Sequence, residues 1–470
     1  MSLSTPILWV ALPLIIAAIA GFFYNRRVVG VLLSSTSALI LALLAALFPE
    51  TMQLSLGPLT LVFEESMNIL GRQITINYQI LPFIALIYGI TALWNLGSGI
   101  QGVPQVFQSG SLMIAALFTA AVGVKPFLYA ALLIEIGVII SIPMLSPFKE
   151  KTHPGILRYL SLQTLAMPFI LLAGWLLTGV ETLPADSALV GQTMLVLGLG
   201  FSLLLSIFPF HSWVPMVSQQ SHPTVTSFLL LLLPSAVLLF GLNFFNQYAF
   251  LRTSPVLYQT LRSLGGLMIV LGGAWTAVEN NLKRALGFSF LTEIGISLLA
   301  VGLSNSGGLN WALMLLPVRA LGFWLWQYAL TLVETHLDAT EMSDLQGFAR
   351  RYPILSLGML IGQLSIAGLP LLASFPIKLS LFTAAFEMGT GPGLWAFAGN
   401  LGLVLFTMRL LISLLSADPK RPDLRWHFLE ATHEYLPILI IILILILLGI
   451  FPNAFPAKIT QTLSAFPKLR

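Results

Sequence analysis

The chain has 470 residues, of which 57% are hydrophobic and 9% charged, with a net charge of +4 and a mean hydropathy of +0.92. This composition excludes a soluble domain, which needs more surface charge. The long apolar runs exclude an outer-membrane barrel, whose strands are short and alternate apolar with polar residues. We therefore predict an all-α polytopic membrane protein. Cysteine is absent, the six histidines show no ligand spacing, and no basic patch interleaves with aromatic residues, so we expect no metal, no cofactor and no nucleic acid partner.

The first feature along the chain is a series of apolar stretches long enough to cross a bilayer, about fourteen in all. They lie near residues 5–24, 28–48, 77–97, 107–122, 126–145, 156–179, 190–210, 224–247, 259–279, 285–303, 307–334, 354–386, 391–416 and 434–452. The connections between them are short. We therefore expect one compact bundle of membrane-spanning helices that lies in a lipid bilayer.

Residues 54–76, between the second and third stretches, differ from the rest. Leu59, Leu61 and Phe63 alternate with other residues before Gly71 interrupts the run. This alternation predicts a short β-hairpin outside the membrane. Its simplest role is a structural cap over the helices.

Positive charges in the loops indicate the orientation of the chain. Loops after odd-numbered stretches carry twelve basic residues: Arg26, Arg27, Lys149, Lys151, Arg158, Lys283, Arg284, Arg350, Arg351, Lys420, Arg421 and Arg425. Loops after even-numbered stretches carry four: Arg72, Lys125, Arg252 and Arg262. The positive-inside rule places the first set in the cytoplasm, so both termini are expected on the opposite face.

Prolines interrupt the seventh and twelfth stretches. Pro209 and Pro215 flank the end of the seventh, and Pro370 and Pro376 lie within the twelfth. Discontinuous helices at matching positions of two halves are typical of inverted-repeat transporters, with helices four to eight here pairing with nine to thirteen. Proline is also common in membrane helices that belong to no repeat.

Five ionisable residues fall inside the predicted helices: Glu135, Glu293, Arg319, Lys378 and Arg409. A charge at mid-bilayer costs roughly 2.5–3.5 kcal/mol on insertion scales, so the presence of each residue needs a structural or functional explanation. Glu135, in AALLIEIGVII, is expected to be the most deeply placed acid. Linked by water, such groups could relay protons. Equally, they could be fixed ion pairs that lock helices together.

Two further positions have a simple structural explanation. Arg409 is placed toward the end of its stretch, and Lys283 at a membrane edge, where a long side chain can reach the interface. Arg319 stays charged and is a poor proton carrier, so we expect it to act as a fixed charge.

Several local strings resemble a known family. These are PFHSWVP at 209–215, with His211 and Trp213 between its prolines, HPTVTS at 222–227, NLKRALGFSFLTEIG at 281–295, TEMSDLQGFARRYP at 340–353, IAGLPLLASFPIK at 366–378 and FTMRLL at 406–411. Together they resemble, in order and spacing, the antiporter-like subunits of respiratory complex I, of Mrp-type antiporters and of membrane-bound hydrogenases. The resemblance covers roughly residues 120–415.

The resemblance implies fourteen helices with two inverted five-helix repeats and broken helices seven and twelve. Residues 1–106 would then hold three helices and the hairpin, 107–247 the first repeat, 259–416 the second, and 417–470 the last helix and tail.

The resemblance also implies residue roles. It implies that Glu135 is the acid of the first half-channel and that Lys378 is the base at the outlet of the second half-channel. Glu293 would complete a modified proton relay, with Lys283, Arg319 and Arg409 as supporting charges. Pro209, His211, Trp213, Pro215, Pro370 and Pro376 would form the helix breaks.

Three departures from the family pattern bear on function. The lysine expected in helix seven is Leu204, the lysine expected in helix eight falls near Ser235 or Ala236, and the histidine expected in helix ten is Glu293. An aliphatic side chain cannot carry a proton, although water can bridge a gap in a wet cavity.

We therefore carry two functions forward. In the first, the chain is an ion-translocating membrane-arm subunit that moves protons or sodium ions, while partner subunits transfer electrons; it holds no catalytic or redox centre of its own. In the second, it is a scaffold subunit of the same kind of complex that no longer pumps. An independent solute carrier is disfavoured because no polar cluster suits a substrate. The expected location is the cytoplasmic membrane or a thylakoid membrane.

Overall fold

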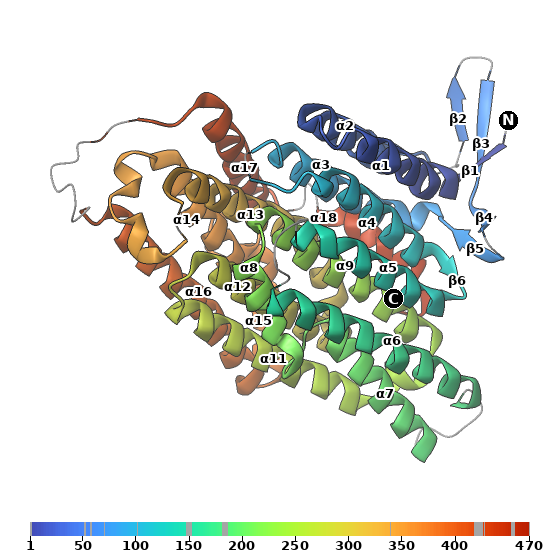
Figure 1. Ribbon diagram of the computed structural model, residues 1–470. Coiled ribbons are helices and arrows are strands. Elements are labelled where there is room, and N and C mark those ends of the chain that lie inside the picture. Colours follow the sequence, from blue (N-terminus) through green and yellow to red (C-terminus); the bar gives the residue numbers. More distant parts are fainter. Residues whose placement is uncertain are drawn as a thin grey trace.

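The protein is an all-α polytopic membrane protein, described here from a computed structural model (Figure 1). The structure describes residues 2–50, 53–56, 59–69, 71–100, 102–146, 153–180, 187–338, 340–417, 426, 428–452 and 456–469. Lys149, Lys151, Lys420, Arg421 and Arg425, which support the predicted orientation, lie outside these ranges.

Among the described residues, eleven helices are long and apolar enough to cross a membrane. They contain α2 (Arg27–Leu47), α3 (Leu81–Gly97), α4 (Val106–Gly123), α5 (Ala130–Leu145), α6 (Pro154–Val180), α9 (Pro223–Gln247), α11 (Pro255–Val278), α12 (Leu282–Gly302), α13 (Gly308–Leu337), α16 (Thr390–Leu415) and α17 (Thr432–Ile450). Three shorter apolar segments are Ile7–Phe22, which ends in α1 (Leu12–Phe22), α7 (Ala188–Leu204) and α14 (Pro353–Ala367). Every predicted stretch corresponds to one of these segments.

The described residues near 54–76 form two antiparallel strand pairs, where the sequence predicts one short hairpin. β2 (Gln53–Leu56) and β3 (Leu59–Glu64) pair antiparallel, and β1 (Ser2–Ser4) adds to β3 in parallel. β4 (Ser66–Ile69) and β5 (Arg72–Thr75) form a second hairpin, extended by β6 (Val124–Lys125). These added strands come from distant parts of the sequence, and they cover hairpin edges that would otherwise leave backbone groups unpaired.

Helices α9, α12 and α13 form the interior of the bundle. Nearly all of α12 is buried, whereas α2, α6 and α17 turn much of their surface outward. The large outward residues are apolar, for example Leu47 of α2, which is 76% exposed, and Trp175 of α6, which is 70% exposed. In water such a surface would be unfavourable, so it is a surface for lipid or for neighbouring subunits.

Two membrane segments are interrupted as the prolines predict. α7 ends at Leu204, and the chain passes through Pro209 and a turn at Phe210–Ser212 before α8 (Trp213–Gln220). α14 ends at Ala367 and is capped by Gly368, and α15 begins at Phe375 and runs to Met388. Each interruption frees carbonyl groups that would otherwise be bonded within a helix, so each is a place where a side chain can be held.

Candidate functional site

The second interruption, between α14 and α15, holds a buried lysine. Lys378 lies one turn into α15 and is 2% exposed. Its ammonium donates to the backbone carbonyl of Ile366, one of the carbonyls freed by the end of α14. Gly368 has φ +77°, and a Cβ placed on it would lie 2.8 Å from Lys378 Cδ. Glycine at 368 therefore permits both the left-handed turn and the passage of the lysine side chain.

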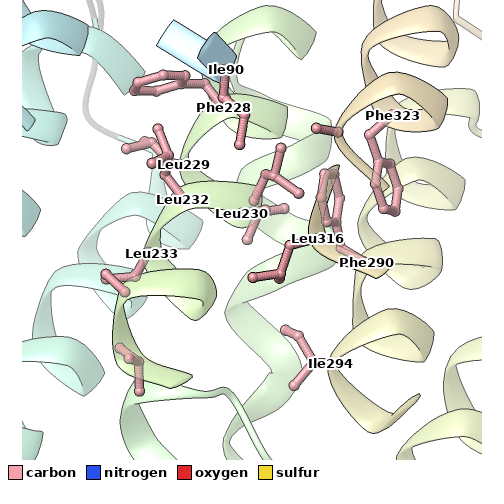
Figure 2. Packing of buried hydrophobic residues seen from close by; sticks show 14 of the residues in the cluster. Ile90, Phe228, Leu229, Leu230, Leu232, Leu233, Phe290, Ile294, Leu316 and Phe323 are labelled. Carbon is pink, nitrogen blue, oxygen red and sulfur yellow. The ribbon is translucent and has the colours of Figure 1, made fainter. Parts of the chain in front are cut away.

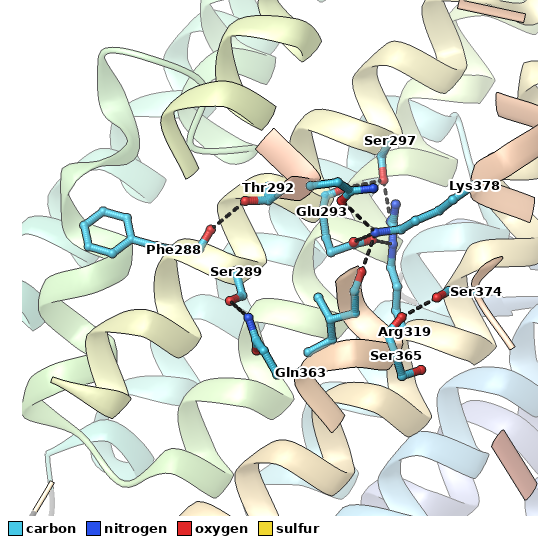
Figure 3. Close-up of polar contacts among 12 residues, drawn as sticks. Phe288, Ser289, Thr292, Glu293, Ser297, Arg319, Gln363, Ser365, Ser374 and Lys378 are labelled. Atoms are coloured by element: carbon cyan, nitrogen blue, oxygen red, sulfur yellow. Dashed lines mark hydrogen bonds and ion pairs between the residues drawn. The ribbon is translucent and has the colours of Figure 1, made fainter. Parts of the chain in front are cut away.

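Glu293 of α12 joins this lysine to an arginine of α13 (Figure 3). Its Oε1 accepts from Lys378 Nζ at 2.5 Å, and its Oε2 accepts from Arg319 Nε. Arg319 Nη1 also donates to Ser297 Oγ at 2.5 Å, one helical turn beyond Glu293, and Asn400 Oδ1 lies 3.4 Å from Lys378 Nζ. We name Glu293, Arg319 and Lys378 the central triad.

The central triad is unbalanced in charge. Glu293 is 2% exposed and Arg319 7% exposed, and one carboxylate faces two potential cations. If all three groups are ionised, the cluster carries a net charge of +1 in an environment where burying charge is costly. Arg319 holds its proton permanently, so Lys378 is the member that can neutralise the cluster by releasing one.

A small cavity of about 40 Å³ adjoins the triad. Glu293, Arg319, Ser297 and Ser235 line it, among leucine and phenylalanine side chains. Arg319 Nη2 is buried and has no hydrogen-bond partner among the described residues. One water needs about 10–15 Å³, so this space accommodates about three or four waters beside the guanidinium.

Beyond this cavity the interior is apolar. In Figure 2, Leu230 of α9 is turned toward Phe290 of α12, which lies beside Phe323 of α13, while Leu229 and Leu233 lie on the other side of α9. The Phe290 and Phe323 rings stack with centroids 3.6 Å apart. Leu204, where the family has a lysine, is 3% exposed. No ionisable group of the described residues occupies this layer, as the lysine-free sequence of the eighth stretch predicts.

Glu135 does not lie in the interior, and the expectation that it is the deepest acid is wrong. It is only partly buried, beside the exposed Ile136 and Ile139 on α5, and its carboxylate accepts from Thr164 Oγ1 of α6 at 2.6 Å. α5 is apolar on all sides, so its sequence gives no sign of which face is turned outward. Among the described residues the most deeply buried acid is Glu293.

Lys283 also differs from expectation. It lies at the start of α12, but instead of reaching outward it is 8% exposed and pairs with Glu334 of α13 at 3.0 Å. Arg409 of α16 behaves as a structural residue: its guanidinium donates to the carbonyls of Ala277 at 2.5 Å and Glu279 at 3.2 Å. It thereby satisfies backbone groups at the end of α11.

The aromatic residues of the first helix break pack against neighbouring rings. Trp213 is 3% exposed, and its ring lies 4.7 Å from that of Tyr159. His211 is half-buried and stacks on Phe208, with ring centroids 5.5 Å apart. Pro209 and Pro215 bracket this turn, while Pro370 is exposed in the second break and Pro376 lies in the first turn of α15.

His222, just before α9, was not singled out as a site residue. Its Nδ1 accepts from the backbone N–H of Thr224 at 3.2 Å and so caps the helix. Burial, together with the nearby positive charges of Lys283 and Arg27, lowers the pKa of His222 to about 3. The imidazole is therefore neutral at physiological pH, as the cap requires.

No group of three or more His, Asp or Glu side chains suited to a metal ion occurs in the described ranges. The residues that sequence reasoning missed are Asn400 and Ser297. Ser297 lies one turn after Glu293, so helical spacing could have identified it; Asn400 is distant in sequence, and only the packing of α16 brings it to Lys378.

Comparison with known proteins gives a consistent result. The profile of a family described as NADH:quinone oxidoreductase/Mrp antiporter, TM, matches residues 170–404. NADH-quinone oxidoreductase subunit N 1 of Herpetosiphon aurantiacus is 26% identical over 291 residues, covering 60% of this chain and 57% of that protein. The chain thus matches less than two thirds of the length of this relative.

Solved structures share the fold over nearly the whole chain. A chain of the membrane-bound sulfane sulfur reductase, an archaeal respiratory membrane complex, has a TM-score of 0.80 and 17% identity, covering 99% of this chain and 98% of that one. A chain of respiratory complex I from Thermus thermophilus has a TM-score of 0.78 and 19% identity, covering 97% and 99%.

Proposed function

The chain belongs to the NADH:quinone oxidoreductase/Mrp antiporter membrane family, and from this membership we propose that it is an ion-translocating subunit of the membrane arm of a complex I-like assembly. Protons, or sodium ions in their place, would cross through this chain, and partner subunits would carry out electron transfer. The named relative and both solved structures come from respiratory complexes, which supports a role inside a larger assembly.

The proposed topology has fourteen crossings and two inverted five-helix repeats, helices four to eight within residues 107–247 and nine to thirteen within 259–416. Residues 1–106 would precede the repeats, and 417–470 would follow them. Two observations support this. The segment from α4 to α9 comprises five crossings, and so does the segment from α11 to α16. In each segment the fourth crossing is broken, into α7 and α8 in the first and into α14 and α15 in the second. A unit of five crossings ends on the opposite side of the membrane, so the next unit is inverted. Both termini would then lie away from the cytoplasm.

The central triad carries the proposal. A buried carboxylate shared by a permanent cation and a titratable one forms a site whose charge changes with a single proton. Glu293 and Arg319 neutralise each other, so the protonation of Lys378 alone decides whether the cluster is neutral or positive. The second half of the relay would exchange its proton at Lys378 Nζ, with Glu293 as the hydrogen-bond partner and the adjoining cavity as the place for water.

Glu135 would serve the first half of the relay from the surface of the bundle. Its contact with Thr164 leaves the carboxylate facing outward between α5 and α6. Leu204 supplies no base inside this chain. A neighbouring subunit packed on this face would therefore complete the path to Glu135.

The test is proton uptake by vesicles that carry the parent complex, measured per electron transferred. Lys378→Met and Glu135→Gln are each expected to lower this ratio, with the complex assembled normally. Arg409→Gln is the matched control, because Arg409 is a charged residue in a membrane helix whose contacts are structural. An unchanged ratio for Lys378→Met in an intact complex would rule out the relay.

The scaffold function is favoured by one observation, the apolar layer around α9 (Figure 2). Across this layer the described structure offers no titratable step between the first half and the central triad. If the chain is a scaffold, all three variants leave the ratio of protons to electrons unchanged, and only variants that prevent assembly have an effect.

A further inference from the structure

An apolar groove of about 570 Å³ opens on the surface of the bundle between α7 and α11. α7 packs chiefly on α6, whereas α11 packs on α12 and α16, so α7 and α11 leave a gap floored by α9 and α12. The groove walls are leucine, phenylalanine, valine and methionine side chains, with Ser202 and Thr260 as the hydroxyl groups among them.

The length of the groove matches one leaflet of a bilayer. Along α7 it runs from Met194 to Leu205, which is about 16 Å at 1.5 Å per residue. Half of a hydrocarbon core is about 15 Å thick. The lining residues of α7 precede its break, those of α9 belong to its second half and those of α11 to its first half. The groove therefore spans one half of the membrane, from the midplane to the end where α9 meets α11.

At that end the groove meets a basic cavity. This second cavity, of about 380 Å³, shares Leu242, Phe245 and Val301 with the groove. Its lining includes the cations of Arg252 and Lys468.

The polar groups of the basic cavity suit an anion. Besides the two cations, Tyr258, Ser304 and Asn305 line it, and no acidic residue of the described chain does. Arg252 Nη1 is held by the carbonyls of Phe245 at 2.9 Å and Asn246 at 2.5 Å. A guanidinium has five N–H donors, so others remain to face the cavity.

We propose that the groove and the basic cavity together bind one anionic phospholipid. An acyl chain would lie along α7 and α11, and the phosphate would lie between Arg252 and Lys468. A free anion would need no apolar groove, whereas this groove has the length of one leaflet. A zwitterionic lipid would gain little from the two cations of the basic cavity, whereas an anionic lipid complements their charge. The site is independent of whether the chain translocates ions.

The groove also adjoins the small cavity beside the central triad, which gives the bound lipid a structural consequence. Leu205, Leu298 and Val301 line both the groove and that cavity. The bound acyl chain would thus close the lateral side of the small cavity against the membrane.

Native mass spectrometry of the purified full chain tests the proposal. The protein is incubated with phosphatidylglycerol or phosphatidylcholine of identical acyl chains, and the retained lipid is counted. Each cation near a lipid headgroup contributes about fivefold and two line this cavity, so the wild type is expected to retain phosphatidylglycerol about twenty-five-fold better. Lys468→Gln lowers this preference about fivefold, because Arg252 remains, and does not affect phosphatidylcholine. Lys458→Gln, an exposed lysine nearby that does not line the cavity, is the control.

A second pair of variants tests the groove. Gly198→Phe places a ring in it, and a Cβ at Gly198 meets no atom within 4 Å, so the variant is expected to fold. It should lower retention of both lipids severalfold. Gly191→Phe is the matched control on the same helix, with equally open space and no part in the groove.

Three results would overturn the proposal. The first is equal retention of the two lipids by the wild type, and the second is normal retention by Gly198→Phe. The third is displacement of phosphatidylglycerol by millimolar inorganic phosphate, which would identify a free-anion site instead.

Discussion

Replacing Glu293 by glutamine is expected to destabilise the protein more than replacing Lys378 by methionine, although both residues belong to the same 2.5 Å hydrogen bond. Glu293→Gln leaves two cations without a counter-charge at positions that are 2% and 7% exposed. Removing one partner of a buried ion pair costs about 3–5 kcal/mol.

Lys378→Met keeps the Glu293–Arg319 pair, lowers the charge of the cluster and fills the vacated volume. Its cost is the unpaired acceptors at Glu293 Oε1 and the Ile366 carbonyl, about 1–3 kcal/mol. The two variants should therefore differ by about 2 kcal/mol in the free energy of unfolding.

The measurement is reversible unfolding of the full chain in mixed micelles, followed by tryptophan fluorescence. The double variant completes a cycle, and contacting residues of this kind couple by about 0.5–3 kcal/mol. If Lys378→Met costs as much as Glu293→Gln, or if the coupling is zero, Glu293 is not the centre of the cluster.

Three further predictions concern other parts of the structure. Gly368→Ala is expected to cost at least 1–2 kcal/mol, because alanine is strained at φ +77° and its Cβ lies 2.8 Å from Lys378 Cδ; unfolding in mixed micelles measures this, and a neutral substitution would contradict the turn. The pKa of His222, about 3 when folded and near 6.5 when unfolded, predicts stability that is fully present above about pH 6.5 and is lost as the pH falls toward 3, by at most about 1.4 kcal/mol per pH unit. His222→Asn, which keeps a capping acceptor, should flatten that dependence, and an unchanged pH profile of unfolding would show that another group is responsible. Arg409→Gln is expected to cost about 1–2 kcal/mol through the lost bonds to the end of α11 while leaving proton translocation unchanged.

The membrane fold could be read from the sequence because lipid restricts the choice of backbone so strongly. Long apolar runs must be helices, and the described segments agree with the predicted ones to within a few residues, apart from the two broken stretches. The breaks were predictable for the same local reason: Pro209 and Pro370 mark the places where α7 and α14 have already ended. The hairpins at 54–76 followed from alternation, but their added strands, Ser2–Ser4 and Val124–Lys125, did not, since each is too short to give a pattern.

The sequence by itself determined that the chain spans a membrane, where its helices break, and which few ionisable residues are placed inside it. Each of these follows from composition or local pattern. Only the tertiary structure decided which of those residues meet. α12 has no distinct polar face, so nothing local indicates that Glu293 faces Arg319, 26 residues away, and Lys378, 85 residues away. The same lack of a polar face hid the outward position of Glu135. Pairing and depth depend on which helices pack together, and that depends on the shape of whole helix surfaces.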